Sequence, residues 1–220
     1  MISLEEELRR KVVEQLRWDS RLDISDLVVE VTGRRVILSG TVGTLMEKLL
    51  AERDVRIIPG VREIENLLQV KYPQDTPGIS DKEITESVLF MLKHSSDINA
   101  DSIKVSTSKG IVTLEGVVRS YWERLKAEDI AEDVTGVIGI NNNLIVALPE
   151  IVPDHIIRED ILEALKRTYA VKPDAIQVEV KNGAVTLTGI VPTWGLYYDI
   201  ENIARYTHGV TGVKNLLQVE

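Results

Sequence analysis

The chain repeats one pattern of residues three times, and this repeat limits its fold more than any other feature. Each copy holds a glycine, a Gly-Val pair whose glycine follows twenty residues later, and an asparagine six residues after that pair begins. The positions are Gly40, Gly60 and Asn66; Gly116, Gly136 and Asn142; and Gly189, Gly209 and Asn215. A spacing kept without gaps in three copies predicts an internal repeat.

The hydrophobic periodicity changes in the same order within each copy. In the second copy, apolar residues recur at helical spacing over residues 84–92 and then alternate over residues 103–107. A tight turn at residues 109–110 leads into a returning strand, a second helix over residues 123–134 and a last strand over residues 140–146. We therefore predict an α+β fold of three tandem αββαβ domains, each a small three-stranded mixed sheet with two helices on one face.

Proline-bearing stretches separate the copies. Residues 71–79 and residues 147–153 each contain two prolines, which interrupt regular structure and stiffen a linker. These stretches predict domain boundaries at residues 1–72, 78–148 and 153–220, called copies one, two and three.

The repeated glycines and asparagines have predicted roles in the scaffold. We expect the glycine of each Gly-Val pair to end the second helix in a left-handed conformation. By its place in the alternation, the asparagine should face inward, become buried and bond to backbone near the earlier glycine of its copy.

Residues 112–146, VTLEGVVRSYWERLKAEDIAEDVTGVIGINNNLIV, carry a resemblance to a known family. The strand glycine, the ER..AE helix, the GV turn and the N.L.V strand resemble the BON domain, named for bacterial osmotically induced and nodulation proteins. The resemblance covers nearly the whole chain as three tandem copies, although the hairpin at residues 33–35 and the second helix at residues 194–198 depart from it. It implies no catalytic activity, an association with phospholipid surfaces and osmotic stress, and potassium binding in one cytoplasmic branch.

Composition excludes several chemistries. The chain has no cysteine, so thiolate metal sites and cysteine nucleophiles are absent, and its formal net charge is −9. No segment has the clustered Lys and Arg that phosphate neutralisation needs, which argues against nucleic-acid binding. The three histidines lack metal-ligand spacing, and neither a nucleophile elbow nor a Gly-rich phosphate loop is present. We predict a non-enzymatic protein without a cofactor or metal.

Aromatic residues gather at the start of the second helix in two copies. These residues and their basic neighbours form a candidate lipid or partner platform: Arg119, Tyr121, Trp122 and Arg124 in copy two, and Trp194, Tyr197 and Tyr198 in copy three. Trp and Tyr favour the lipid–water interface, since each joins an apolar ring to a polar tip. The alternative is packing, in which these rings cover their own sheet or a neighbouring domain.

Three functions remain open at this stage. The first is recognition of phospholipid surfaces or of an envelope- or stress-related protein partner. The second is a cytoplasmic sensor of potassium or another small ion, and the third is a scaffold that binds only proteins. No segment is long and apolar enough for a signal peptide or a membrane span, so we expect a cytoplasmic protein. Because a chain that had lost its signal peptide would read the same, the periplasm is the alternative.

Overall fold

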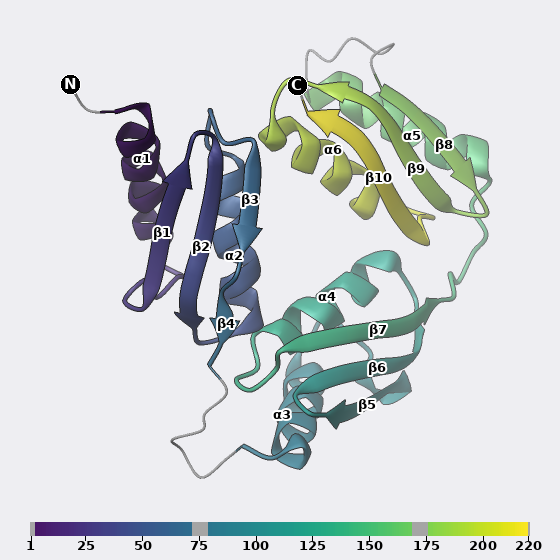
Figure 1. Ribbon diagram of the computed structural model, residues 1–220. Helices are drawn as coiled ribbons and strands as arrows, with labels where there is room; N and C mark the ends of the chain where they lie inside the picture. Colours follow the sequence, from purple (N-terminus) through teal and green to yellow (C-terminus); the bar gives the residue numbers. More distant parts are fainter. Residues whose placement is uncertain (1–2, 72–78, 169–175, 220) are drawn as a thin grey trace. The chain divides into compact units, whose positions relative to one another are not determined.

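The computed structural model describes residues 3–71, 79–168 and 176–219, and within these ranges each copy is an αββαβ unit (Figure 1). Copy one contains α1 (Leu4–Trp18), β1 (Leu27–Thr32), β2 (Arg35–Val42), α2 (Leu45–Arg56), β3 (Glu63–Asn66) and β4 (Gln69–Val70). Copy two contains α3 (Asp81–His94), a short 3-10 helix (Ala100–Ser102), β5 (Ile103–Ser108), β6 (Ile111–Val118), α4 (Tyr121–Glu132) and β7 (Gly139–Val146). Copy three contains α5 (Asp154–Thr168), β8 (Ile176–Lys181), β9 (Ala184–Val191), α6 (Trp194–Tyr206) and β10 (Gly212–Val219). The predicted α+β repeat is confirmed.

Each sheet has the returning strand at its centre. The orders are β1-β2-β3, with β4 also on β2, then β5-β6-β7 and β10-β9-β8. In copy three, β8 is antiparallel to β9 and β10 is parallel to it, with Leu187 placed opposite both Val178 and Asn215. This mixed topology follows from the chain order, since a hairpin joins the first two strands and a helix crossover returns the third.

One face of each sheet carries the core. In copy one, Val29 and Leu38 from the sheet and Leu68 between β3 and β4 pack with Val12 from α1 and Val55 from α2 in a single buried cluster. In copy three, Val178, Leu187 and Leu217 pack in the same way with Ile161 and Ile200. The helices therefore cover the apolar sheet face, as the alternation predicts.

An acidic residue in the first turn of the first helix holds the hairpin turn of its own copy. In copy three, the two carboxylate oxygens of Asp154 accept hydrogen bonds from the backbone N–H groups of Asn182 and Gly183, both at 2.9 Å. Asp81 does the same for Lys109 and Gly110 in copy two. The turn residues have positive φ angles, and their N–H groups consequently point together toward the carboxylate. Helix and hairpin are thus joined through charge-assisted bonds.

We expect Asp154→Ala to lower the free energy of unfolding of copy three by about 2 kcal/mol, because two backbone donors lose a charged acceptor. The measurement is urea unfolding followed by the fluorescence of Trp194, with Trp18 and Trp122 changed to Phe. Asp160→Ala, an exposed acid on the same helix, is the control and should change stability by less than about 0.5 kcal/mol. Equal effects of the two substitutions would contradict a clamp.

The Gly-Val glycines have the expected left-handed conformation but a different place in the chain. Gly60, Gly136 and Gly209 have φ angles of 105°, 93° and 89°. The preceding helices end at Arg56, Glu132 and Tyr206, so each glycine lies in the turn beyond the helix and not at its last turn. The prediction that this glycine ends the helix was wrong, because a short turn separates the helix from the last strand.

Candidate functional site

The start of α4 presents one aromatic ring outward and one inward. Trp122 is 36% exposed, and Arg119, three residues earlier, is also exposed. Tyr121 is partly buried and packs against the apolar core cluster of copy three. Neighbouring residues on a helix point about 100° apart, so one ring of the pair can pack while the other meets solvent. Only Trp122 of these two rings is available as an exposed surface.

Arg124, the second predicted basic neighbour, is half-buried. Arg124 takes part in an interaction within the protein, through its side chain or its backbone. It is therefore not part of the exposed group proposed here. The exposed group in copy two therefore consists of Arg119 and Trp122, with Val117 beside them in sequence and 47% exposed.

In copy three, the predicted aromatic residues form one cluster at the start of α6. The ring centroid of Trp194 lies 5.1 Å from that of Tyr197 and 6.3 Å from that of Tyr198, and the two tyrosine rings are 5.4 Å apart in an edge-on arrangement. All three side chains are half-buried, and Tyr197 also packs on the core of its own copy. Ring pairs at these distances stabilise each other. The cluster is thus a pre-ordered aromatic surface, part of which is committed to packing.

Sequence reasoning missed the most exposed tryptophan. Trp18, the last residue of α1, is 79% exposed. It has no Trp, Tyr or Phe equivalent in the other copies. A helical projection could have found it, because Trp18 falls outside the stripe formed by Leu8, Val12 and Leu16.

In copies one and two, the repeated asparagine bonds to the covering helix and not to the earlier glycine. The Asn66 amide donates to the backbone carbonyl of Lys48 at 3.0 Å and to the Glu52 carboxylate at 3.2 Å, both on α2. Its side-chain oxygen accepts from the backbone N–H of Leu68 at 3.2 Å. Asn142 likewise donates to Glu128 on α4 at 2.8 Å. The predicted partner was therefore wrong in these two copies, where the half-buried asparagine joins the last strand to the second helix. The Asn215 amide nitrogen of copy three has no hydrogen-bond partner in the described part of the chain.

The glutamate at the position of Glu52 has a different neighbour in copy two. In copies one and three, Glu52 and Glu201 form ion pairs with Arg56 and Arg205, one helical turn later. The corresponding residue of copy two is Glu132, which follows Glu128. Burial, with the carboxylates of Glu128 and of nearby acids, raises the pKa of Glu132 from 4.5 to about 7. Copy two thus replaces an ion pair with two acids one helical turn apart, and the pKa of Glu132 rises as a result.

Copy one contains a buried acid that the other copies lack. Asp54 is 5% exposed, and its Oδ2 atom has no hydrogen-bond partner in the described part of the chain. Burial, together with the charge of Asp19, raises the pKa of Asp54. Asp19 itself bonds to Arg21, which lowers the pKa of Asp19 to about 2. The equivalent positions in copies two and three are isoleucines.

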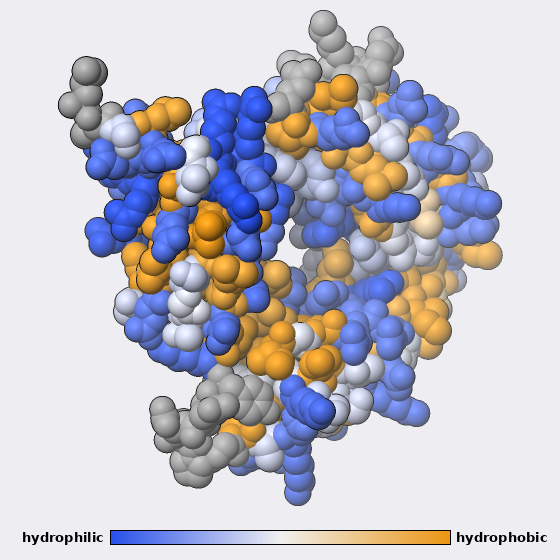
Figure 2. All heavy atoms as spheres, viewed as in Figure 1, coloured by the Kyte–Doolittle hydropathy of each residue, from blue (hydrophilic) through white to orange (hydrophobic). Residues whose placement is uncertain are grey.

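The outer face of the copy one sheet carries an apolar patch. Val28 and Leu67 are 49% and 52% exposed, with Ile37 partly exposed on the same sheet. Figure 2 shows apolar side chains over the middle of this sheet and hydrophilic ones toward the hairpin end. At that end, Arg35 forms ion pairs with Glu63 and Glu65.

The described ranges hold no cluster of three or more His, Asp or Glu side chains arranged to bind a metal ion. Among the helices of those same ranges, none is both long and apolar enough to cross a membrane. The arrangement is a set of small α+β units with aromatic, apolar and charged groups on their surfaces.

The chain belongs to the BON domain family. A family model described as BON domain matches residues 5–72, 80–147 and 153–220, which accounts for most of the chain as three copies. Osmotically-inducible protein Y of Escherichia coli (strain K12) is 28% identical over 148 residues, covering 64% of this chain and 74% of that protein.

Two solved structures of CdsD, a structural protein of the type III secretion system of Chlamydia trachomatis, were also found. Each is 12% identical and covers 97% of this chain. The match covers 92% of the chain in the first CdsD structure, with a TM-score of 0.27. It covers 98% of the chain in the second structure, which is the C-terminal domain of CdsD, with a TM-score of 0.26. Superpositions at this level establish neither the fold nor the function of this chain.

Proposed function

We propose that this protein is a non-enzymatic recognition protein that binds phospholipid surfaces under osmotic stress. Membership of the BON domain family and the likeness to an osmotically inducible protein support this proposal. The observation that carries it is the exposed pair of Arg119 and Trp122 at the start of α4.

Physical chemistry assigns complementary roles to the two side chains. The indole of Trp122 favours the lipid–water interface, and the guanidinium of Arg119 attracts anionic headgroups. Because the whole chain has a net charge of −9, attraction to an anionic bilayer must come from local groups and should weaken as salt is added.

The aromatic cluster of copy three offers a second contact. Trp194 and Tyr198 are half-buried and therefore keep part of each ring at the surface. Two weak contacts on one chain bind more tightly than either alone when both reach the same surface. Such attachment needs no spanning helix, and it is compatible with the cytoplasm and with the periplasm.

The test is co-sedimentation of the intact protein with anionic and with neutral phospholipid vesicles. Trp122→Ala should reduce binding to anionic vesicles about tenfold, which corresponds to a loss of about 1.4 kcal/mol. Trp18→Ala is the matched control, because Trp18 is more exposed and lies in a different copy. Circular dichroism checks that each variant keeps its secondary structure.

Either of two outcomes would reject this site. If the intact protein fails to sediment with anionic vesicles at low salt, lipid binding is wrong. If Trp18→Ala weakens binding as much as Trp122→Ala does, the contact is not specific to α4.

Recognition of a protein partner is the second candidate function. Val28 and Leu67 support it, because their half-exposed side chains form an apolar patch with Ile37 on the outer face of copy one. Substitution of both exposed residues by Ser would test it, by abolishing partner capture without changing vesicle binding. Sensing of potassium or another small ion has no comparable observation in its favour.

A further inference from the structure

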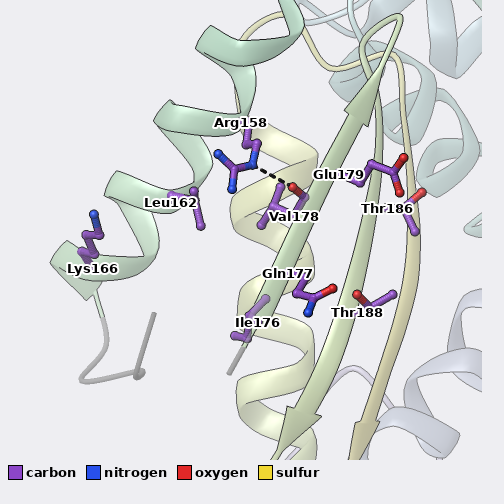
Figure 3. Close-up of a pocket in the computed structure, with 9 residues that line it drawn as sticks. All are labelled: Arg158, Leu162, Lys166, Ile176, Gln177, Val178, Glu179, Thr186 and Thr188. Atoms are coloured by element: carbon purple, nitrogen blue, oxygen red, sulfur yellow. Dashed lines mark hydrogen bonds between the residues drawn. The ribbon is translucent and has the colours of Figure 1, made fainter. Parts of the chain in front are cut away.

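A groove beside the first strand of copy three has two cations, Arg158 and Lys166, on the wall formed by its helix. It has a volume of about 600 Å³ and is lined by residues of α5, β8 and β9. Figure 3 shows Arg158, Leu162 and Lys166 along one side of α5, facing the strand that carries Val178. The Arg158 Nε atom donates to the Val178 carbonyl at 3.1 Å.

Copy one has an equivalent groove, of about 240 Å³. The two grooves share six lining positions: Arg9 and Arg158, Val13 and Leu162, Arg17 and Lys166, Leu27 and Ile176, Val28 and Gln177, and Val29 and Val178. The Arg9 Nε atom donates to the Val29 carbonyl at 3.0 Å, as in copy three. The groove is consequently a repeated feature of the fold, with the same bond in both copies.

The four cations of these grooves have no ion-pair partner in the described part of the chain. Their helix neighbours do: Lys11 pairs with Glu7, and Arg167 pairs with Glu163. Arg17 and Lys166 lie in the last turn of their helices, where a cation complements the helix dipole. That role does not occupy their donor groups. Within the residues that the structure describes, the terminal nitrogens of Arg9 and Arg158 make no hydrogen bond to the protein.

Both grooves run beside a strand with an open edge. β1 and β8 are terminal strands of their sheets and pair with one neighbour each. Because the Val29 and Val178 carbonyls face the arginine and not the sheet, the backbone groups of alternate residues point outward with them. Outward N–H and C=O groups are the template on which an extended chain adds as a strand.

The spacing of the cations matches an extended chain. Arg9 and Arg17 are eight residues apart on a helix, a distance of about 12 Å along its axis. Four residues of an extended strand cover about 13 Å, and side chains four apart lie on one face. A single phosphate group is too small to meet both cations, whereas two acidic side chains spaced by four residues fit. Glu179 also lines the copy three groove, and its negative charge is opposite in sign to the charges of Arg158 and Lys166.

We propose that the grooves of copies one and three each bind an extended acidic segment of a partner protein, which pairs with the edge of β1 or β8. Two carboxylates of the segment meet Arg9 and Arg17 in copy one, or Arg158 and Lys166 in copy three. The aliphatic side chains of Val13 and Leu162 lie between the cations and contact the apolar side of the segment. This site is separate from the aromatic residues proposed to contact lipid.

The test uses a fluorescein-labelled seven-residue peptide of Val and Thr with Glu at its second and sixth positions. Fluorescence anisotropy with the intact protein should show saturable binding at 100 mM salt. The variant Arg9→Gln with Arg158→Gln should weaken binding at least about tenfold, since both grooves lose a charge-assisted contact. Arg10→Gln with Arg167→Gln changes the same net charge on the outer faces of the same helices and should alter binding less than about twofold.

Two altered peptides separate strand pairing from charge alone. A peptide with Lys in place of both Glu residues should not bind. A peptide with the two Glu residues kept and alternate backbone nitrogens methylated should lose at least about tenfold in affinity if edge pairing is involved. Equal binding of the methylated peptide, equal loss in both protein variants, or no saturable binding would overturn the proposal. Loss of vesicle binding in the Arg9 and Arg158 variant, without peptide binding, would instead assign the grooves to phospholipid headgroups.

Discussion

Replacing Gly40 with alanine is expected to unfold copy one while copy three stays folded. Gly40 has a φ of 105°, and an added Cβ would lie 2.0 Å from the backbone carbonyl oxygen of Asp26. That oxygen belongs to the chain entering β1 and accepts a hydrogen bond from Thr41, so it cannot move aside as a flexible side chain would. Relief requires the first two strands to separate at Leu27, which is paired with Gly40.

The expected cost exceeds about 4 kcal/mol, the range in which strain and a backbone clash combine. A unit of about 70 residues has a total stability of similar size, so copy one should lose its cooperative fold. Hydrogen exchange measured by mass spectrometry resolves the copies. Peptides from residues 27–42 should exchange rapidly, while peptides from residues 184–191 keep their protection.

Gly33→Ala is the control within the same copy. Gly33 also has a positive φ, of 62°, but no atom lies within 4 Å of its added Cβ. The conformational cost alone is about 1 kcal/mol, which copy one should survive. If the two substitutions had equal effects, the clash with Asp26 would not be what fixes glycine at position 40. The corresponding Cβ at Gly116 would lie 1.9 Å from the Ser102 carbonyl, so the same experiment is available in copy two.

The order of helices and strands could be predicted from sequence because three copies record the same periodicity. A two-residue period over residues 27–31 and a helical period over residues 8–16 follow from which side chains meet the core. The contacts of Asn66 could not be predicted in this way. Alternation shows that its side chain turns toward the helices, but only the three-dimensional packing brings the Lys48 carbonyl within reach.

The candidate site was predictable only as a region. Clustering of aromatic residues identified the start of the second helix as a region. Which ring there is exposed depends on how the helix is rotated about its axis, and this rotation places Trp122 at the surface and Tyr121 against a core cluster. Asp54 was missed for another reason. The aligned repeats place Asp54 where the other copies have Ile130 and Ile203. Hydrophobic periodicity identifies this position as buried, but it does not predict what one acid does there.

Glu132→Arg is expected to stabilise copy two, by an amount that depends on pH. The substitution restores the arrangement of copy three, where Arg205 binds Glu201 at 2.8 Å. In the natural chain, burial and the charges of Glu128, Asp129 and Asp133 raise the pKa of Glu132 from 4.5 to about 7. Because the folded state binds this proton more tightly than the unfolded state does, its stabilising contribution is full below about pH 4.5 and is lost as the pH rises to about 7.

The shift corresponds to at most about 3 kcal/mol, and partial solvent exposure of Glu132 reduces this to about 2 kcal/mol. Glu132→Arg should therefore raise the free energy of unfolding by about 2 kcal/mol at pH 8 and change it by less than about 0.5 kcal/mol at pH 5. Urea unfolding reports on copy two through Trp122 when Trp18 and Trp194 are changed to Phe.

Two further variants identify the cause of the gain. Glu132→Gln keeps the shape of the side chain and removes its proton, so the difference between pH 5 and pH 8 should shrink while the ion pair with Glu128 is not made. Glu115→Arg introduces the same charge change at an exposed position on β6 and should have little effect at either pH. If Glu132→Arg gave the same gain at pH 5 and pH 8, ionisation of Glu132 would not limit the stability of copy two. A gain confined to pH 8 would instead mean that the stability of copy two falls as Glu132 ionises near neutral pH. Copies one and three avoid this loss at the same position because arginine occupies it.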